Sequence, residues 1–200
     1  MSVLKRSTVM DLNEYIQVYD YTLSDDVCKH LIRVFNEQDV ETLDNNGRPK
    51  FQQFNITQWL DDNTEHHDDW KDIGILHNAL IESSHYWVQK YMDDVDCRMW
   101  FPPRSELEQF RVKKYTAGTD DRFDIHVDVG DHPSAKRFLS IFWYLNNVSE
   151  GGETIFKDGP TIKPKAGRMV VFPPLWVFPH EGRPTISNDK YLVSTYTHYV

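Results

Sequence analysis

Residues 136–173 read KRFLSIFWYLNNVSEGGETIFKDGPTIKPKAGRMVVFP. Runs rich in β-branched and aromatic residues alternate here with turn signals such as Gly151-Gly152 and Asp158-Gly159-Pro160. Runs of this kind are typical of β-strands, and glycine and proline mark the connections between them. The stretch therefore predicts strands in close succession over 136–146, 153–157, 160–164 and 167–173.

The flanks of this stretch continue the pattern. Further runs predict strands over 106–116, 122–129, 177–181 and 190–199. About eight short strands with such punctuation indicate a sandwich or jelly roll. Predicted helices precede the strands instead of alternating with them, so a parallel doubly wound sheet is not expected.

The first half of the chain has a different texture. Residues 14–22 alternate like a strand, and Ser24 then fits the N-cap of a helix. Residues 69–92 carry apolar side chains at helical spacing and predict the longest helix. Residues 40–62 are polar and irregular, and Asn46-Gly47 within them is a hairpin-turn signal, so a hairpin or finger is expected there.

Length and charge limit the function classes. The 200 residues suit one domain, with residues 1–104 as N-terminal support and residues 105–200 as the β core. The formal net charge is −9, and the acidic excess lies almost wholly in residues 1–100. A nucleic-acid binder needs a basic stripe and an anionic membrane surface attracts basic segments, so neither partner is expected.

Targeting segments and cysteine content indicate the cellular compartment of a protein. No apolar run approaches the roughly 20 residues of a membrane-spanning helix, and no signal-peptide pattern follows Met1. Cys28 and Cys97 make neither a CxxC motif nor a disulfide framework. We therefore expect a cytoplasmic protein.

Three polar residues could form a metal site. His126 and Asp128 alternate along a predicted strand, so their side chains would project from the same face. Taken alone, the two residues also fit a solvated or hydrogen-bonded pair. His180 follows 54 residues later, and two histidines with one carboxylate are the ligands of the facial triad that holds Fe(II).

Lys190 is a further candidate. If strand 190–199 lines a barrel, Lys190, Leu192, Ser194 and Tyr196 share one face. A buried ammonium needs a partner, which a dicarboxylate cosubstrate would supply. An exposed lysine at the start of a strand is the alternative.

Several segments occur together in a recognisable order. They are Arg111–Gly118, Phe123-Asp-Ile-His126-Val-Asp128, Arg137–Asn146, Gly151-Gly152-Glu153-Thr154, Lys163–Phe172, His180–Pro184 and Lys190-Tyr191. In this order, region 110–199 resembles the catalytic domain of the Fe(II)/2-oxoglutarate dioxygenases, in their prolyl 4-hydroxylase-like branch and its small microbial and viral type. The resemblance implies a double-stranded β-helix (jelly roll) core, mainly β with α, with supporting N-terminal helices.

The resemblance also implies roles for single residues. His126, Asp128 and His180 would be both the catalytic residues and the iron ligands. Lys190 would pair with the distal carboxylate of 2-oxoglutarate, although Arg183 near His180 is a second cation that leaves this partner open. The cosubstrate pocket would be completed by Tyr115, Tyr144 and Thr154. The substrate would be bordered by Arg137 and Tyr196.

The function implied is hydroxylation of prolyl residues in a protein or peptide. Fe(II) would be bound as the cofactor, and 2-oxoglutarate and O₂ would be consumed as cosubstrates. Ascorbate would be the reductant, and succinate and CO₂ would be the coproducts. Alternatives are hydroxylation of another residue or of a free small molecule, a non-catalytic jelly-roll metal- or ligand-binding module, and a cupin-like metal enzyme without 2-oxoglutarate. The oligomeric state is left open.

Overall fold

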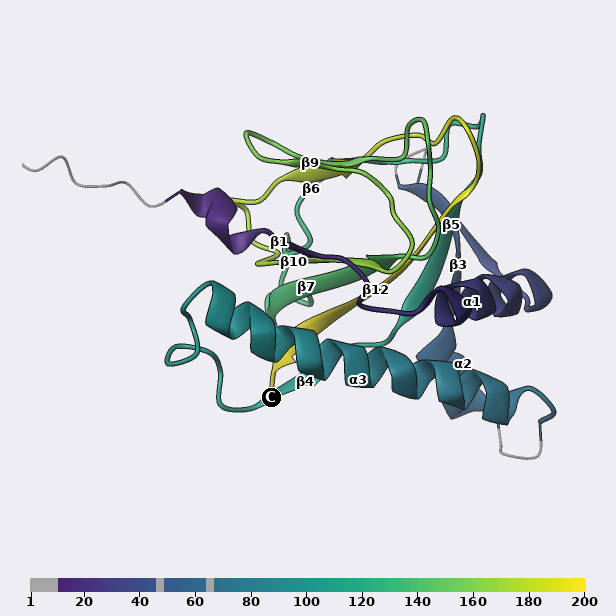
Figure 1. The fold of residues 1–200 in the computed structure, drawn as a ribbon, viewed down its shortest axis with the longest axis horizontal. Coiled ribbons are helices and arrows are strands. Elements are labelled where there is room, and N and C mark those ends of the chain that lie inside the picture. The colour runs from purple at the N-terminus through teal and green to yellow at the C-terminus, as the bar shows by residue number, and fades with distance from the viewer. Residues whose placement is uncertain (1–10, 46–48, 64–66) are drawn as a thin grey trace, which may run out of the picture.

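Two antiparallel β-sheets form the centre of the computed structural model, which describes residues 11–45, 49–63 and 67–200 (Figure 1). The eight-stranded sheet has the order β1 (Gln17–Tyr19), β10 (Arg168–Phe172), β7 (Arg137–Tyr144), β12 (Lys190–Tyr199), β5 (Arg111–Tyr115), β3 (Lys50–Asn55) and β2 (Glu41–Asp44), with β4 (Ser105–Leu107) paired to β12. The four-stranded sheet has the order β6 (Phe123–His126), β11 (His180–Gly182), β8 (Thr154–Phe156) and β9 (Thr161–Ile162). This architecture confirms the predicted jelly roll.

Helices cover one face of the large sheet (Figure 1). A 3₁₀-helix, η1 (Leu12–Tyr15), precedes β1, and the α-helices are α1 (Asp25–Glu37), α2 (Ile56–Asp62) and α3 (Trp70–Asp94). Buried residues of α1 and α3, among them Leu31, Leu76 and Leu80, pack with Trp143 and Val193 of the sheet. The helical side therefore holds the larger of the two apolar cores.

The opposite face of the large sheet packs against the small sheet. Tyr115, Phe142 and Leu192 of the large sheet share a second core with Phe156 and Ile162 of the small one. Neighbouring residues of a strand point to opposite faces, so β5, β7 and β12 each contribute to both cores. This alternation leaves a row of side chains from these strands between the two sheets, where the functional site lies.

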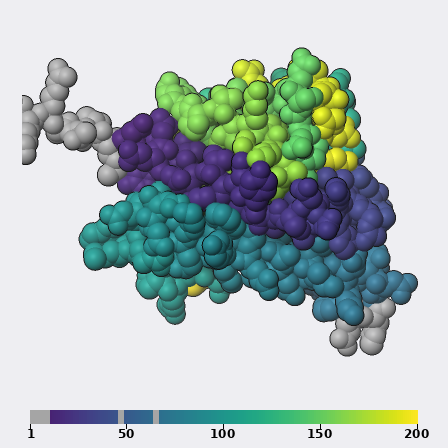
Figure 2. Space-filling view, in the orientation of Figure 1, coloured from purple at the N-terminus to yellow at the C-terminus, as the bar shows by residue number. Residues whose placement is uncertain are grey.

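The N-terminal segment runs between the helical layer and the strand layer. On the face shown in Figure 2, residues from η1 to α1 form a band between α3 and the strands β8 to β10. Ser24 is the N-cap of α1 as predicted, and its side chain accepts a hydrogen bond from the Val27 backbone N–H at 3.2 Å. Of the helices in the described residues, none has both the length and the hydropathy that spanning a membrane requires.

Three local expectations differ from the structure. Residues 14–22 contain only the short β1, because η1 occupies their beginning. Region 106–116 divides into β4 and β5, and region 40–62 contains α2 after its hairpin strands. The side chain of Asn55 caps α2 by accepting from the Gln58 backbone N–H at 3.1 Å. The predicted turn Asn46-Gly47 lies outside the described residues.

Candidate active site

The two histidines of the predicted triad lie directly opposite each other in the small sheet. Strand β6 pairs antiparallel with β11, and His126 is the register partner of His180. Asp128 follows two residues after His126, just beyond the end of β6. Ligand atoms of the three side chains all lie within 4.8 Å of one another. The strand pairing therefore brings together residues that are 54 positions apart in the sequence.

Local hydrogen bonds orient both imidazole rings. Nδ1 of His126 lies 2.8 Å from the carbonyl oxygen of Asp124, and Nδ1 of His180 lies 3.1 Å from that of Phe178. A proton on each Nδ1 satisfies these carbonyls, and this assignment leaves the lone pair of each Nε2 free. The two Nε2 atoms lie 3.4 Å and 3.9 Å from the oxygens of Asp128.

The Asp128 carboxylate adds an observation that points to a cation. Its Oδ2 atom is buried and has no hydrogen-bond partner among the described residues. A buried oxygen of this kind is costly unless a charge partner satisfies it. Two imidazole nitrogens and one carboxylate oxygen are the donor set that holds Fe(II) while leaving positions open for other ligands. The residues present therefore fit a divalent iron site.

The protonation states favour the same ion. Burial opposes ionisation of Asp128, but its interactions with His126, His180 and Lys113 outweigh burial and lower its pKa to about 2. Burial lowers the pKa of His180, with Asp128 opposing. An ionised carboxylate and a neutral imidazole are the forms that coordinate metal.

A cavity extends from this cluster into the space between the sheets. Its lining includes the three candidate ligands, four residues from one face of β12, and residues of β5, β7 and β8. The β12 residues are those that the alternation predicted to share a face, Lys190, Leu192, Ser194 and Tyr196. This part of the sequence-based interpretation is confirmed.

Lys190 lies in this cavity with 1% of its surface exposed. Its Nζ donates to the carbonyl oxygen of Gly152 at 3.0 Å and lies 4.2 Å from the centre of the Tyr115 ring. Gly152 has φ +75°, and a Cβ there would lie 3.3 Å from Cδ of Lys190, so glycine suits this close approach. Burial lowers the pKa of Lys190 to about 7, with Glu153 opposing.

Tyr144 and Thr154 form a buried hydrogen-bonded pair. The Tyr144 hydroxyl donates to Oγ1 of Thr154 at 2.6 Å. Thr154 lines the cavity, whereas Tyr144 is not among its lining residues. Tyr144 could therefore act on a bound cosubstrate only through Thr154.

Arg137 and Tyr196 lie beside the three candidate metal ligands. The guanidinium of Arg137 donates to both carboxylate oxygens of Glu108 at 2.8 Å, and its centre lies 4.0 Å from that of the Tyr196 ring. Its Nη1 also lies 3.4 Å from the carbonyl oxygen of Asp128. Tyr196 lines the cavity and Arg137 does not. Arg137 thus lies behind Tyr196 in this arrangement, with its charge already paired.

Arg183 lies outside the cavity lining. Its Nε forms an ion pair with Glu181 at 3.0 Å, and 55% of its side-chain surface is exposed. Of the two cations that the sequence left open as carboxylate partners, only Lys190 faces the cavity.

Two lining residues that bear on the chemistry were not predicted from the sequence. Phe123 stacks on the His126 ring with centroids 3.5 Å apart. Lys113 lies in the same cavity, and burial lowers its pKa to about 8, with Asp128 opposing. Strand alternation from Tyr115 places Lys113 on the same face, so period-two counting contains the signal for it.

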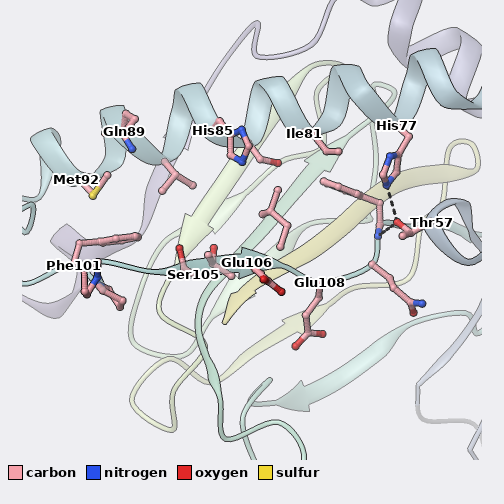
Figure 3. Close-up of a pocket in the computed structure, with 18 of the residues that line it drawn as sticks. Thr57, His77, Ile81, His85, Gln89, Met92, Phe101, Ser105, Glu106 and Glu108 are labelled. Atoms are coloured by element: carbon pink, nitrogen blue, oxygen red, sulfur yellow. Dashed lines mark hydrogen bonds between the residues drawn. The ribbon is translucent and has the colours of Figure 1, made fainter. Parts of the chain in front are cut away.

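A larger groove of about 800 Å³ lies on the other face of the large sheet, between α3 and the segment around β4. Figure 3 shows His77, Ile81 and His85 projecting into it from α3 above Glu106 and Glu108. His77 hydrogen-bonds Oγ1 of Thr57 at 3.0 Å, and burial lowers its pKa. Among the residues that the structure describes, those lining the groove form no cluster of potential metal ligands like that of the smaller cavity.

Comparisons with known proteins agree with this geometry. Residues 110–198 match the family model of the 2OG-Fe(II) oxygenase superfamily. Prolyl 4-hydroxylase 2 of Arabidopsis thaliana is 23% identical in an alignment that covers 90% of this chain and 66% of that protein. Probable prolyl 4-hydroxylase 11 of the same plant is 28% identical over 47% of this chain and 35% of its own. The chain thus spans about two thirds and about one third of the lengths of these relatives.

Two solved structures share the fold. The viral collagen prolyl hydroxylase of Paramecium Bursaria Chlorella virus-1, solved as a 2OG complex, has a TM-score of 0.69 and 21% identity over 93% of this chain and 97% of its own. A prolyl hydroxylase from Trichoplax adhaerens, solved with a peptide fragment of hypoxia inducible factor, has a TM-score of 0.69 and 12% identity over 92% of this chain and 84% of its own.

Proposed function

We propose that this chain, whose residues 110–198 belong to the 2OG-Fe(II) oxygenase superfamily, hydroxylates prolyl residues in a peptide or protein. One observation carries the oxygenase part of the proposal. The triad His126, Asp128 and His180 and the buried cation Lys190 line a single cavity. A metal-chelating dicarboxylate fits that combination, because one end can bind the metal while the other pairs with the ammonium.

Each residue then has a distinct task. His126, Asp128 and His180 hold Fe(II), and Lys190 binds the far carboxylate of 2-oxoglutarate, next to the Tyr115 ring and the Thr154 hydroxyl. Bound together, Fe(II), 2-oxoglutarate and O₂ supply the oxidising chemistry and yield succinate and CO₂. Phe123, Phe142 and Leu192 line the same cavity and exclude water from the reacting groups. The protein contributes orientation and a dry pocket.

The prolyl substrate is supported by the relatives and by the aromatic wall beside the metal. Both Arabidopsis relatives are named as prolyl 4-hydroxylases, and the Trichoplax enzyme was solved with a peptide. Tyr196 presents its ring to the cavity and is held in place by the Arg137 guanidinium. A proline ring packs well against a flat aromatic face, so Tyr196 is the proposed contact.

The test is turnover with defined peptides. Purified protein is incubated with Fe(II), ascorbate as the proposed reductant, 2-oxoglutarate and proline-containing peptides, alongside the same peptides with alanine for each proline. We expect succinate together with a 16 Da mass gain on proline, and no gain on the alanine peptides. A mass gain on another residue would reject the prolyl substrate but keep the oxygenase.

Matched histidine variants complete the test. His126→Ala removes a triad member and should abolish succinate formation. His132→Ala changes an exposed histidine outside the cluster and should leave succinate formation intact. Equal turnover by the wild type and His126→Ala would reject the oxygenase assignment itself.

A further inference from the structure

A second cation faces the site from strand β5. Arg111, Lys113 and Tyr115 alternate along this strand and share its inner face. Tyr115 is the register partner of Lys190, and Lys113 is the register partner of Leu192 on the same strand. Two residues along a strand span about 7 Å. Lys113 therefore lies one side-chain row away from the proposed anchor of the far carboxylate.

Lys113 forms no salt bridge in the described residues, and Asp128, a proposed metal ligand, is the one acidic group there that raises its pKa. Its Nζ lies over the Phe51 ring, 5.1 Å from the ring centroid. Arg111, next along the same face, donates to the amide oxygen of Gln109 at 2.6 Å and pairs with no carboxylate in the described chain. By contrast, Lys114 on the opposite face pairs with Asp189 at 3.0 Å.

The charges in the loaded site also leave Lys113 without a counter-charge. When Fe(II) and 2-oxoglutarate are bound, the metal and Lys190 carry three positive charges in total. The carboxylate of Asp128 and the two carboxylates of the cosubstrate carry three negative charges, which balance them. The ammonium of Lys113 is then left without a counter-charge inside the cavity. An unpaired charge in a half-buried position is costly, so an additional anion would bind there favourably.

The anion most consistent with this position belongs to the substrate. Lys113 lines the same cavity as the proposed iron ligands, on the side bordered by β3, where Gln53 is its register partner. Residues of an extended peptide are spaced by about 3.5 Å, so a side chain next to the reacting residue can reach a group in the same cavity.

We propose that Lys113 binds a carboxylate of the substrate and selects peptides with an acidic residue adjacent to the hydroxylated one. The inference rests on the proposed function and adds a substrate class to it. The carboxylate at the metal-side end of 2-oxoglutarate could bind Lys113 in the same way. The test must therefore distinguish a carboxylate of the substrate from that of the cosubstrate.

Equilibrium binding provides that test without turnover. Protein loaded with Mn(II) and 2-oxoglutarate under anaerobic conditions is titrated with fluorescent peptides that carry Glu, Gln or Lys beside a central proline. A charge-assisted contact predicts that the Glu peptide binds about tenfold more tightly than the Gln peptide. Matching peptides with alanine for proline measure the acidic preference independently of the prolyl proposal.

Three variants locate the preference. Lys113→Met should reduce the Glu-to-Gln ratio to about one, and Lys113→Arg should retain a preference for Glu. Lys114→Met removes a positive charge from the same strand but from its opposite face, so the ratio should stay near that of the wild type. In all three variants, the affinity for 2-oxoglutarate should remain within about twofold of the wild type.

The outcomes separate the two proposals. A Glu preference that is lost in Lys113→Met but does not depend on proline would support the acidic substrate class and reject the prolyl one. Equal binding of Glu and Gln peptides by the wild type would overturn the inference while leaving prolyl hydroxylation intact. A tenfold loss of 2-oxoglutarate affinity in Lys113→Met, with the peptide ratio unchanged, would assign Lys113 to the cosubstrate and overturn the inference. Failure of every peptide to bind would reject both proposals.

Discussion

Asp128 is the residue in the candidate site whose environment most clearly requires a cation. One of its carboxylate oxygens is buried without a partner in the described residues, and both histidine Nε2 atoms lie within 3.9 Å of the carboxylate. Asp128→Asn keeps the shape of the side chain but removes its charge. We expect Mn(II) affinity to fall by at least about 100-fold, because the loss of a charged ligand exceeds the 10–100-fold effect of losing an outer-shell partner.

Isothermal titration of Mn(II) into the wild type and Asp128→Asn measures this change. His132→Ala is the control, since that side chain is exposed and lies outside the cluster. Affinities within threefold of each other for the wild type and Asp128→Asn would contradict the metal assignment.

Lys190 should make cosubstrate binding dependent on pH. Burial lowers its pKa to about 7, and the far carboxylate of 2-oxoglutarate needs the charged form. Below pH 7 the lysine is already protonated and affinity should be level. Above pH 7 the proton must be taken up on binding, so affinity should fall by about tenfold per pH unit until the raised pKa of the complex is reached.

Lys190→Arg provides the comparison, because a guanidinium does not titrate in this range. Titration of 2-oxoglutarate into Mn(II)-loaded protein from pH 6 to 9 should give a sloping profile for the wild type and a flat one for Lys190→Arg. A flat wild-type profile would mean that another group anchors the far carboxylate.

At the scale of single elements, the cap of α1 is separable from the site. Ser24 accepts a hydrogen bond from the Val27 backbone N–H, and Asp25 and Asp26 follow it in the first turn. Ser24→Ala should reduce the free energy of unfolding by about 1 kcal/mol, whereas Ser24→Asp, which can also cap, should cost little. Urea denaturation measures both, and an unchanged midpoint for Ser24→Ala would contradict this role of the cap.

The strands of the core could be predicted because their signal is local. Each predicted run from residue 106 onward overlaps at least one observed strand, and the alternation along β12 places Lys190, Leu192, Ser194 and Tyr196 on the cavity side. The helix α2 was missed because its seven residues span only two turns, which is too few to show a period. Strand partners, such as β3 beside β5, depend on contacts between distant segments and have no local signal.

The site was predictable in part for the same reason. His126, Asp128 and His180 could be singled out by residue type and spacing, but their proximity comes from the pairing of β6 with β11. Arg137 was expected to border the substrate, yet Glu108 neutralises it and Tyr196 covers it. Lys113 was missed because a lysine in a strand is usually solvated, and only the hairpin strand β3 and the small sheet enclose it here.

At the scale of the whole molecule, the proposed ligands connect the two sheets. The metal ligands belong to the small sheet and the segment after β6, whereas Lys190 and Tyr115 belong to the large sheet. Mn(II) together with 2-oxoglutarate should therefore stabilise the fold. At a free ligand concentration of 100 times Kd, the free energy of unfolding rises by about 2.7 kcal/mol. This gain corresponds to an increase of roughly 5–10 °C in Tm for a chain of this length.

Thermal melts with Mn(II), 2-oxoglutarate, both or neither test this stabilisation. The shift with both should exceed the sum of the separate shifts, because the metal and the ammonium bind opposite ends of one molecule. Asp128→Asn should lose the joint shift. Purely additive shifts would indicate that the two ligands bind independently of each other.

The central claim is that this chain is an oxygenase that couples 2-oxoglutarate to substrate oxidation, and turnover under ¹⁸O₂ tests it most directly. Mass spectrometry would follow both succinate and the peptide product. The account predicts one ¹⁸O atom in succinate and one in the hydroxylated residue, with both signals absent in His126→Ala. Product oxygen derived from water, or peptide oxidation without labelled succinate, would contradict it.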